Sequence, residues 1–280
     1  MLRARVLGAL SLEVDGRPVR QVGGLKPRSV LAWLLLNPGP HARARVAARF
    51  WPDVLDTSAR ASLRSALWTI RGTLEQVGGD HYLVSDRDSV GISRELPLEV
   101  DAQEFWRLSS SDTARDLERA LELVSSPLLT DLADDWVLEA RDDYAARAAA
   151  VALRLADEAE AAGDPRRAAL RTRQALAHDR LSETTYRLLV RRLADAGERA
   201  QALSTLRRLE TVLAAEFGTV PSAETQALAA RLRAPPEKDR RPVASSAPRR
   251  PAGPLVGRDR ERETLRSAWE AARAVRARSP

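Results

Sequence analysis

The 280-residue sequence contains no cysteine, a single methionine and only three histidines. Without cysteine, disulfide bonds and thiolate-ligated zinc or iron centres are excluded. The histidines, His41, His81 and His178, lie far apart and lack the spacing of metal ligands, so we expect no metal site. Long apolar runs are also missing. The N-terminus MLRARVLGAL resembles neither a signal peptide nor a membrane span, so we expect a cytoplasmic protein without membrane contact.

Sequence motifs for catalysis and nucleotide binding are absent as well. The chain has no G-x-x-x-x-G-K-[ST], G-x-G-x-x-G, G-x-S-x-G or H-E-x-x-H motif. The acidic pairs Asp134-Asp135 and Asp142-Asp143 lie in segments expected to be helical, where solvent-exposed carboxylates are the commoner explanation. We therefore expect a protein that is not an enzyme and that binds no cofactor through this chain.

Charge is distributed unevenly along the chain. Residues 1–94 hold 14 basic and 8 acidic residues, a net of +6; residues 95–233 hold 19 and 25, a net of −6; residues 234–280 hold 12 and 6, a net of +6. A basic N-terminal module is suited to a polyanion and an acidic body is not. Chance variation on solvated surfaces is the alternative explanation.

The N-terminal region combines short strands with three helices. Strands are expected within the first 22 residues, where Asp15-Gly16 is a hairpin turn signal. A helix opens at Lys26-Pro27 and stops at Asn37, and a second runs from about residue 43 to 51. Strands at 82–85 and 90–93 form a hairpin. This order predicts a winged helix-turn-helix.

The third helix, residues 59–74, is the most informative segment. Apolar residues at 59, 63, 66, 67, 70 and 74 form a helical stripe, and Asp56-Thr57-Ser58 supplies candidate capping residues. The opposite face presents polar and basic side chains: Arg60, Arg64, Ser65, Trp68 and Arg71. Arginines on one helix face can read guanine in the major groove, whereas the alternative is an ordinary charged surface. The hairpin that follows favours DNA; whether Trp68 meets a base or covers apolar surface is left open.

Weaker candidates for DNA contact lie near helix starts and in the hairpin. Lys26, Arg28, Arg43 and Arg45 are expected to contact phosphates, and Arg87 lies at the hairpin turn.

Residues from about 101 onward read as helical, with helices expected at 112–124 and 136–162. The pattern Ala162-Gly163-Asp164 with Ala168-Ala169 recurs 34 residues later as Ala196-Gly197-Glu198 with Ala202-Leu203, which is the tetratricopeptide period. The fold expected is mostly α. The domains expected are a winged helix at 1–95, a helical bundle at 98–233, a flexible linker at 234–254 and a further segment at 255–280.

Several segments together resemble the Streptomyces antibiotic regulatory protein (SARP) family. They are FWPDVLDTSARASLRSALWTIRGTL, YLVSDRDSVGISRELPLEVDAQEF, LLTDLADDWVLEARDDY and AHDRLSETTYRLLVRRLADAGERAQALSTLRRLETVLAAEFGTVPSAET. The resemblance spans roughly residues 1–233 and implies an OmpR-type winged helix followed by a bacterial transcriptional activator domain. The tail PLVGRDRERETLRSAWEAARA resembles the entry to a STAND/AAA-type nucleotide-binding domain. The chain departs from many members in its wing, where Arg87-Asp88-Ser89-Val90 replaces Pro-Pro-Gly-Tyr, and at His178-Asp179-Arg180, where many carry proline.

What the resemblance implies is a transcriptional regulator that binds direct repeats in double-stranded promoter DNA, self-associates there and recruits RNA polymerase. The polymerase contact would be the link between the second and third helices: Pro52, Asp53, Val54, Leu55, Asp56 and Thr57. Control of secondary metabolism would follow. Two alternatives stay open, a tetratricopeptide-type interaction scaffold and the N-terminal part of an ATP-dependent switch. Whether the protein activates or represses is also open.

Overall fold

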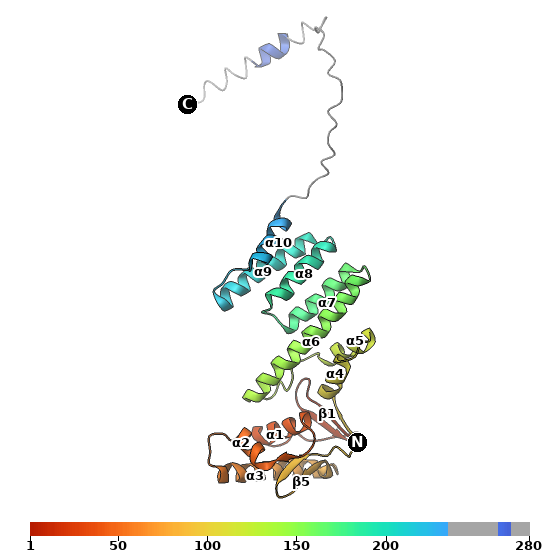
Figure 1. Ribbon diagram of the computed structural model, residues 1–280, viewed down its shortest axis with the longest axis vertical. Coiled ribbons are helices and arrows are strands. Elements are labelled where there is room, and N and C mark those ends of the chain that lie inside the picture. Colours follow the sequence, from red (N-terminus) through yellow and green to blue (C-terminus); the bar gives the residue numbers. More distant parts are fainter. Residues whose placement is uncertain (235–262, 270–280) are drawn as a thin grey trace. The chain divides into compact units, whose positions relative to one another are not determined.

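The computed structural model describes Met1–Ala234 and residues 263–269 (Figure 1). Met1–Ala234 forms one compact unit. Sheets and three helices lie at its N-terminal end, and the remaining helices stack beyond them (Figure 1). The expected linker at 234–254 lies outside the described residues apart from Ala234. The expected nucleotide-binding segment at 255–280 lies outside them apart from a helix at 263–269.

Two small sheets frame the N-terminal region. The first has the strand order β3-β2-β1-β7, formed by β1 (Leu2–Arg5), β2 (Ser11–Val14), β3 (Arg17–Pro18) and β7 (Leu98–Val100). β1 pairs antiparallel with β2 and parallel with β7. The second has the order β4-β6-β5, formed by β4 (His41–Ala42), β5 (Leu83–Ser85) and β6 (Ser89–Ile92). The expected hairpin is therefore present, with a third strand, β4, that we did not predict.

Three helices lie between these sheets: α1 (Leu25–Leu36), α2 (Arg43–Phe50) and α3 (Asp56–Glu75). The apolar stripe predicted on α3 is buried throughout, with Leu63, Ile70 and Leu74 fully inaccessible. The capping prediction was wrong. Leu55 is the N-cap, and no side chain caps this helix, because Asp56 already lies in its first turn.

The helical bundle contains α4 (Asp101–Ser109), α5 (Ala114–Leu123), α6 (Asp135–Ala161), α7 (Pro165–His178), α8 (Glu183–Asp195), α9 (Arg199–Phe217) and α10 (Ala223–Arg233). The 34-residue repeat is visible in its turns. Asp164 N donates to the carbonyl of Ala159, and Glu198 N donates to that of Leu193. Gly163 and Gly197 both have positive φ, 76° and 78°. Identical turns at identical spacing confirm a tetratricopeptide-like arrangement of the pairs α6–α7 and α8–α9.

Residues 124–134, expected to be helical, instead join the two regions. Leu129 N donates to the Val6 carbonyl and Thr130 N to the Gly8 carbonyl, so this segment runs beside the link between β1 and β2. Because these amides donate to the link, they are not available for helical hydrogen bonds. We call this segment, with the residues that it contacts in α1, the junction.

Side chains of the N-terminal region and of the bundle form hydrogen bonds and an ion pair at and around the junction. Asp131 accepts a hydrogen bond from Leu10 N (3.0 Å) and forms an ion pair with Arg28 (2.5 Å). Asp101 accepts from the amides of Val6 and Leu7; burial raises the pKa of its carboxyl, and these amides oppose the rise. Arg141 donates to the carbonyls of residues 128, 129 and 132. Hydrogen-bond donors and acceptors of the N-terminal region and of the bundle therefore pair with one another here, although the two regions are separate in sequence.

One apolar core runs through both regions. It includes Leu2 of β1, Leu31 of α1, Phe50 of α2, Phe105 of α4 and Val151 of α6. A second, smaller core lies farther along the bundle, around Tyr186 and Leu206. The expected boundary between residues 95 and 98 therefore does not separate two cores, because β7 beyond it belongs to the N-terminal sheet. In the part of the chain that the structure describes, no helix is long and apolar enough to cross a membrane.

Candidate nucleic-acid interface

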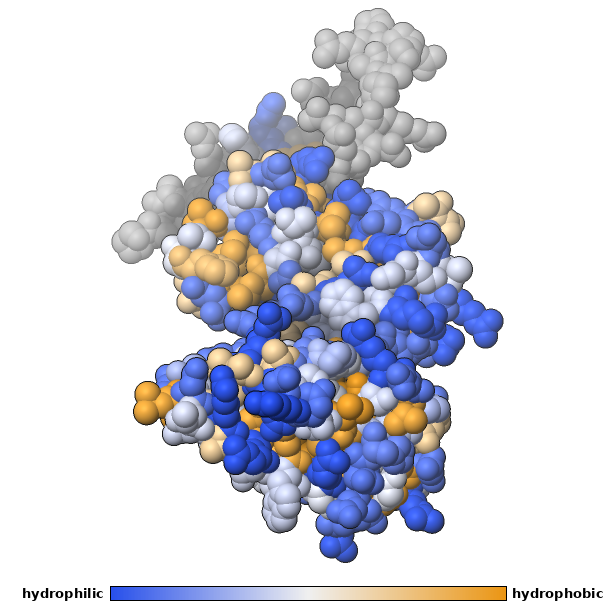
Figure 2. All heavy atoms as spheres, turned by 60° about the horizontal axis from the view of Figure 1, so that its bottom comes forward, coloured by the Kyte–Doolittle hydropathy of each residue, from blue (hydrophilic) through white to orange (hydrophobic). Residues whose placement is uncertain are grey.

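Helix α3 presents a polar face opposite its buried stripe. Arg60, Arg64, Ser65, Trp68 and Arg71 are all exposed, and Trp68 retains 78% of its accessible surface. Among the described residues, no ion pair engages Arg60, Arg64 or Arg71. Figure 2 shows strongly hydrophilic side chains across this end of the molecule. The face therefore offers arginine donors to an external acceptor.

The hairpin of β5 and β6 forms the wing beside α3. Its turn is closed by Asp86, whose carboxylate accepts from the amides of Asp88 (2.7 Å) and Ser89 (2.6 Å) and from the Ser89 hydroxyl (2.7 Å). The hydrogen bond from the Ser89 hydroxyl, and then those from the two amides, lower the pKa of the Asp86 carboxyl. Arg87 is exposed at the tip. The turn is ordered by its own side chains.

Two of the predicted DNA-contacting arginines hold the wing. The Arg43 guanidinium donates to Ser85 Oγ (2.7 Å) and to the Asp86 carbonyl (3.3 Å). Arg71 donates to the Leu83 carbonyl (3.2 Å). Arg43 starts α2 and Arg71 lies near the end of α3, so the wing is fixed against both helices. Arg43 is thus better placed to position the wing than to contact phosphate.

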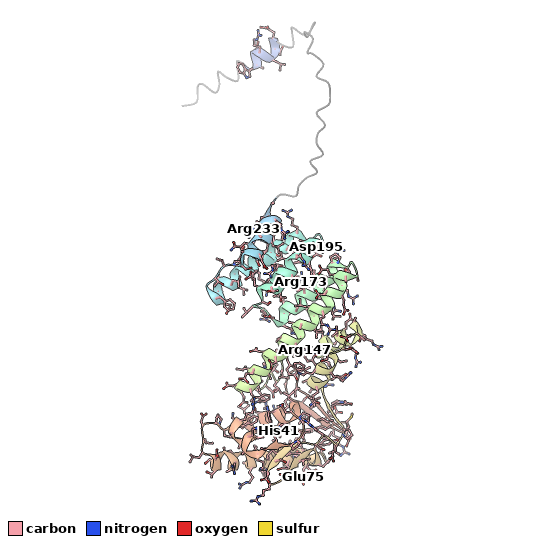
Figure 3. The ribbon with its side chains drawn as sticks, in the orientation of Figure 1. His41, Glu75, Arg147, Arg173, Asp195 and Arg233 are labelled. Carbon is pink, nitrogen blue, oxygen red and sulfur yellow. The ribbon has the colours of Figure 1, made fainter. Side chains whose placement is uncertain are left out.

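Close backbone packing also fixes the wing, at a point that sequence reasoning missed. A Cβ atom on Gly91 would lie 1.8 Å from the Gly39 carbonyl oxygen, so only glycine fits there. β4 pairs with β6 at His41↔Val90, and the His41 ring packs against that of Trp33, with centroids 4.6 Å apart and planes tilted by 58°. His41 is labelled in Figure 3. Glycine within a strand pattern was the available signal for this close approach.

A groove of about 630 Å³ opens between the start of α2, α3 and the wing tip. Four arginines line it, together with two carboxylates and three apolar residues: Arg43, Arg60, Arg64, Arg87, Asp86, Asp88, Ala42, Ala44 and Leu63. The excess of cationic side chains suits a polyanionic backbone.

Lys26 and Arg28 lie apart from this groove. Lys26 Nζ is 2.7 Å from Asp134 Oδ1, and Arg28 is largely buried in its pair with Asp131. Both cations therefore have acidic partners within the chain, at the junction. Arg45 of α2 is exposed, and no ion pair of the described residues includes it.

The predicted link between α2 and α3, residues 52–57, is exposed at every position, although its last two residues already form the start of α3. Two of its apolar side chains are notably accessible, Val54 at 45% and Leu55 at 79%. Exposed apolar side chains beside the carboxylates of Asp53 and Asp56 are compatible with contact to another protein.

The chain is similar to known proteins in sequence and in fold. Residues 100–233 match the family model of the bacterial transcriptional activator domain. The chain is 26% identical over 243 residues to the transcriptional regulatory protein EmbR of Mycobacterium tuberculosis and of Mycobacterium bovis, an alignment that covers 81% of this chain. It spans 62% of the length of those relatives.

The fold is also similar to a solved structure, Mycobacterium tuberculosis EmbR in complex with a low-affinity phosphopeptide. The TM-score is 0.63 at 24% sequence identity, and the match covers 82% of this chain and 64% of that one. The activator-domain match, the aligned relatives and the shared fold together make the chain similar to SARP-type transcriptional regulators such as EmbR, over its winged helix and its tetratricopeptide-like bundle.

Proposed function

We propose that the chain binds double-stranded promoter DNA, with α3 lying in the major groove. The observation that carries the proposal is the exposed face of α3, where Arg60 and Arg64 lie one helical turn apart and no ion pair of the described residues includes them. Arg71, on the same face, donates to the Leu83 carbonyl and so positions the wing. Recognition helices of winged-helix proteins present such donors to base edges. Trp68, beside them and 78% exposed, would supply apolar contact to a thymine methyl or a sugar.

The backbone contacts would come from the groove between α2, α3 and the wing. Arg87 lines it on the wing side, opposite the base-reading face of α3, and Arg45 is exposed on α2. Phosphate contacts position a protein on the duplex and make its affinity salt-dependent. Lys26 and Arg28 take no part in this proposal, because Asp134 and Asp131 already engage them.

The proposal also covers how copies of the chain assemble on DNA and how they affect transcription. Copies bind direct repeats on one face of the duplex, and the acidic bundle contributes protein–protein contacts between neighbouring copies. The link Pro52–Thr57 contacts RNA polymerase, so the protein activates transcription in the cytoplasm, with genes of secondary metabolism as targets. Transcriptional regulators are not a class of enzymes, and the absence of catalysis stays a prediction.

Replacing Arg64 with alanine should weaken binding to the cognate site by about 5- to 150-fold, equivalent to roughly 1–3 kcal/mol, and relax base preference at one position. Mobility-shift titrations on the cognate duplex and on single-base variants measure both effects. The control is Arg180→Ala, which removes an exposed arginine of the bundle. Unchanged affinity in a folded Arg64→Ala protein would show that α3 is not the recognition helix.

Arg43 and Arg45 should differ in their effect on salt dependence. Arg45→Ala should reduce the slope of log affinity against log salt by about 0.9, the value for one phosphate contact. Arg43→Ala should weaken binding and leave the slope unchanged, because its guanidinium holds the wing. Titrations at four salt concentrations supply the slopes. A lower slope for Arg43→Ala would mean that Arg43 contacts phosphate directly.

Cooperativity should depend on helical phase. The full chain should fill a two-repeat site cooperatively when the repeats are spaced by about 10–10.5 base pairs, which places both copies on one face. Inserting about five base pairs should abolish the cooperativity, because the bundles then face away from each other. Both probes are titrated by mobility shift at one fixed salt concentration. Equal cooperativity on the two probes would refute contact between neighbouring copies.

A further inference from the structure

A second groove lies where the α2–α3 link meets the start of α6, at the junction. Its volume is about 550 Å³. Apolar side chains form one part of its lining and charged side chains the other: Phe50, Trp51, Pro52, Val54 and Trp136, with Asp53, Asp134, Asp135, Glu139, Lys26 and Arg49. The residues come from both the winged helix and the bundle, so neither region alone makes this surface.

The two walls of the groove are fixed against each other. Phe50 and Trp136 are 2% and 8% exposed and meet edge to face, with ring centroids 6.3 Å apart. Trp136 Nε1 also donates a hydrogen bond to Ser29 Oγ of α1 (2.9 Å). This buried contact holds the end of α2, and therefore the link that follows it, beside the first turns of α6.

The groove carries uncompensated negative charge. Lys26 neutralises Asp134, and hydrogen bonds from Lys26 and Ser29 outweigh the effect of burial and lower the pKa of Asp134. Asp53, Asp135 and Glu139 are exposed, and within the described residues no ion pair includes them. Among the described residues that line the groove, Arg49 is the remaining cation, and its guanidinium lies 5.6 Å from the centre of the Trp33 ring.

Exposed apolar side chains flank these carboxylates. Leu55 of the link is 79% exposed, and Leu138, next to Glu139 on α6, is 47% exposed. A surface with this composition repels the phosphates of DNA and attracts a basic segment that also has apolar residues to bury. Charge therefore separates it from the arginine-lined groove at α3.

We propose that the α2–α3 link and the first turns of α6 form one docking surface for a basic, amphipathic segment of RNA polymerase. The inference rests on the proposed function and extends it. The polymerase contact is not the link alone, and the bundle supplies Asp135 and Glu139 to it. Basic side chains of the partner lie against Asp53, Asp135 and Glu139, and its apolar side chains cover Val54, Leu55 and Leu138.

The test uses the full chain, a two-repeat promoter fragment and RNA polymerase holoenzyme of the host organism. Transcript yield and DNA affinity are measured separately for Asp53→Lys, Glu139→Lys and Glu139→Gln. The matched control is Glu158→Lys, because Glu158 is exposed on the same helix, about 29 Å from Glu139 at 1.5 Å rise per residue.

Glu139→Lys should reduce activation by about tenfold or more, since like charges are then juxtaposed across the interface. Its DNA affinity should stay within about twofold of wild type, because Glu139 does not line the arginine-rich groove between α2, α3 and the wing. Asp53→Lys should behave in the same way, Glu139→Gln should lose less, and Glu158→Lys should match wild type.

Three outcomes would overturn the inference. If wild-type protein neither binds the promoter nor stimulates transcription, the proposed function fails and the inference with it. If Asp53→Lys loses activation while Glu139→Lys keeps it, the link acts alone and only the inference is wrong. If Glu139→Lys lowers cooperative filling of the two-repeat probe without polymerase, the surface joins copies of this chain instead.

Discussion

The junction between the winged helix and the bundle is the constraint on which the rest of the structure depends. There Asp131 pairs with Arg28 and accepts the Leu10 amide, while Arg141 donates to three carbonyls of the same segment. Leu129 takes a left-handed conformation, with φ of 48°, a strained position that its surroundings maintain. Around these polar contacts the apolar core continues from β1 into α6. Removing one partner would leave a largely buried charge unpaired, which is costly.

Because the junction joins the winged helix to the bundle, the surfaces of the two regions have fixed positions relative to one another. The arginine face of α3 and the wing lie together because Arg43 and Arg71 hold the hairpin against two helices. The α2–α3 link lies beside α6 because Phe50 packs on Trp136. Farther along, Arg147 of α6, labelled in Figure 3, lies over the Trp106 ring of α4 at 5.1 Å. In the proposed function, a protein that reads DNA with one end thereby presents a protein-binding surface at a fixed position.

Local patterns predicted the elements well, and tertiary contacts decided what the patterns could not. The stripe on α3, the wing and the 34-residue repeat follow from periodicity and turn chemistry, which act within short stretches of chain. Arg28 and Arg43 were expected at phosphates as exposed basic side chains near helix starts. The structure gives Arg28 an acidic partner 103 residues away and places Arg43 against the wing, 42 residues away. No single-sequence pattern identifies such partners. The same limit applies to residues 124–134, which bond to the link between β1 and β2, and to the groove that joins Asp53 to Glu139.

Calorimetric unfolding of the full chain tests most directly whether the winged helix and the bundle are one cooperative unit. The account predicts a single transition for the compact unit in wild type, with calorimetric and van't Hoff enthalpies in agreement. Arg28→Met should lower its midpoint and separate it into two transitions, because Asp131 loses its buried partner. Lys26→Met should do neither, since Lys26 is the more exposed member of the same junction. Two transitions in wild type, with midpoints that Arg28→Met leaves unchanged, would contradict the account.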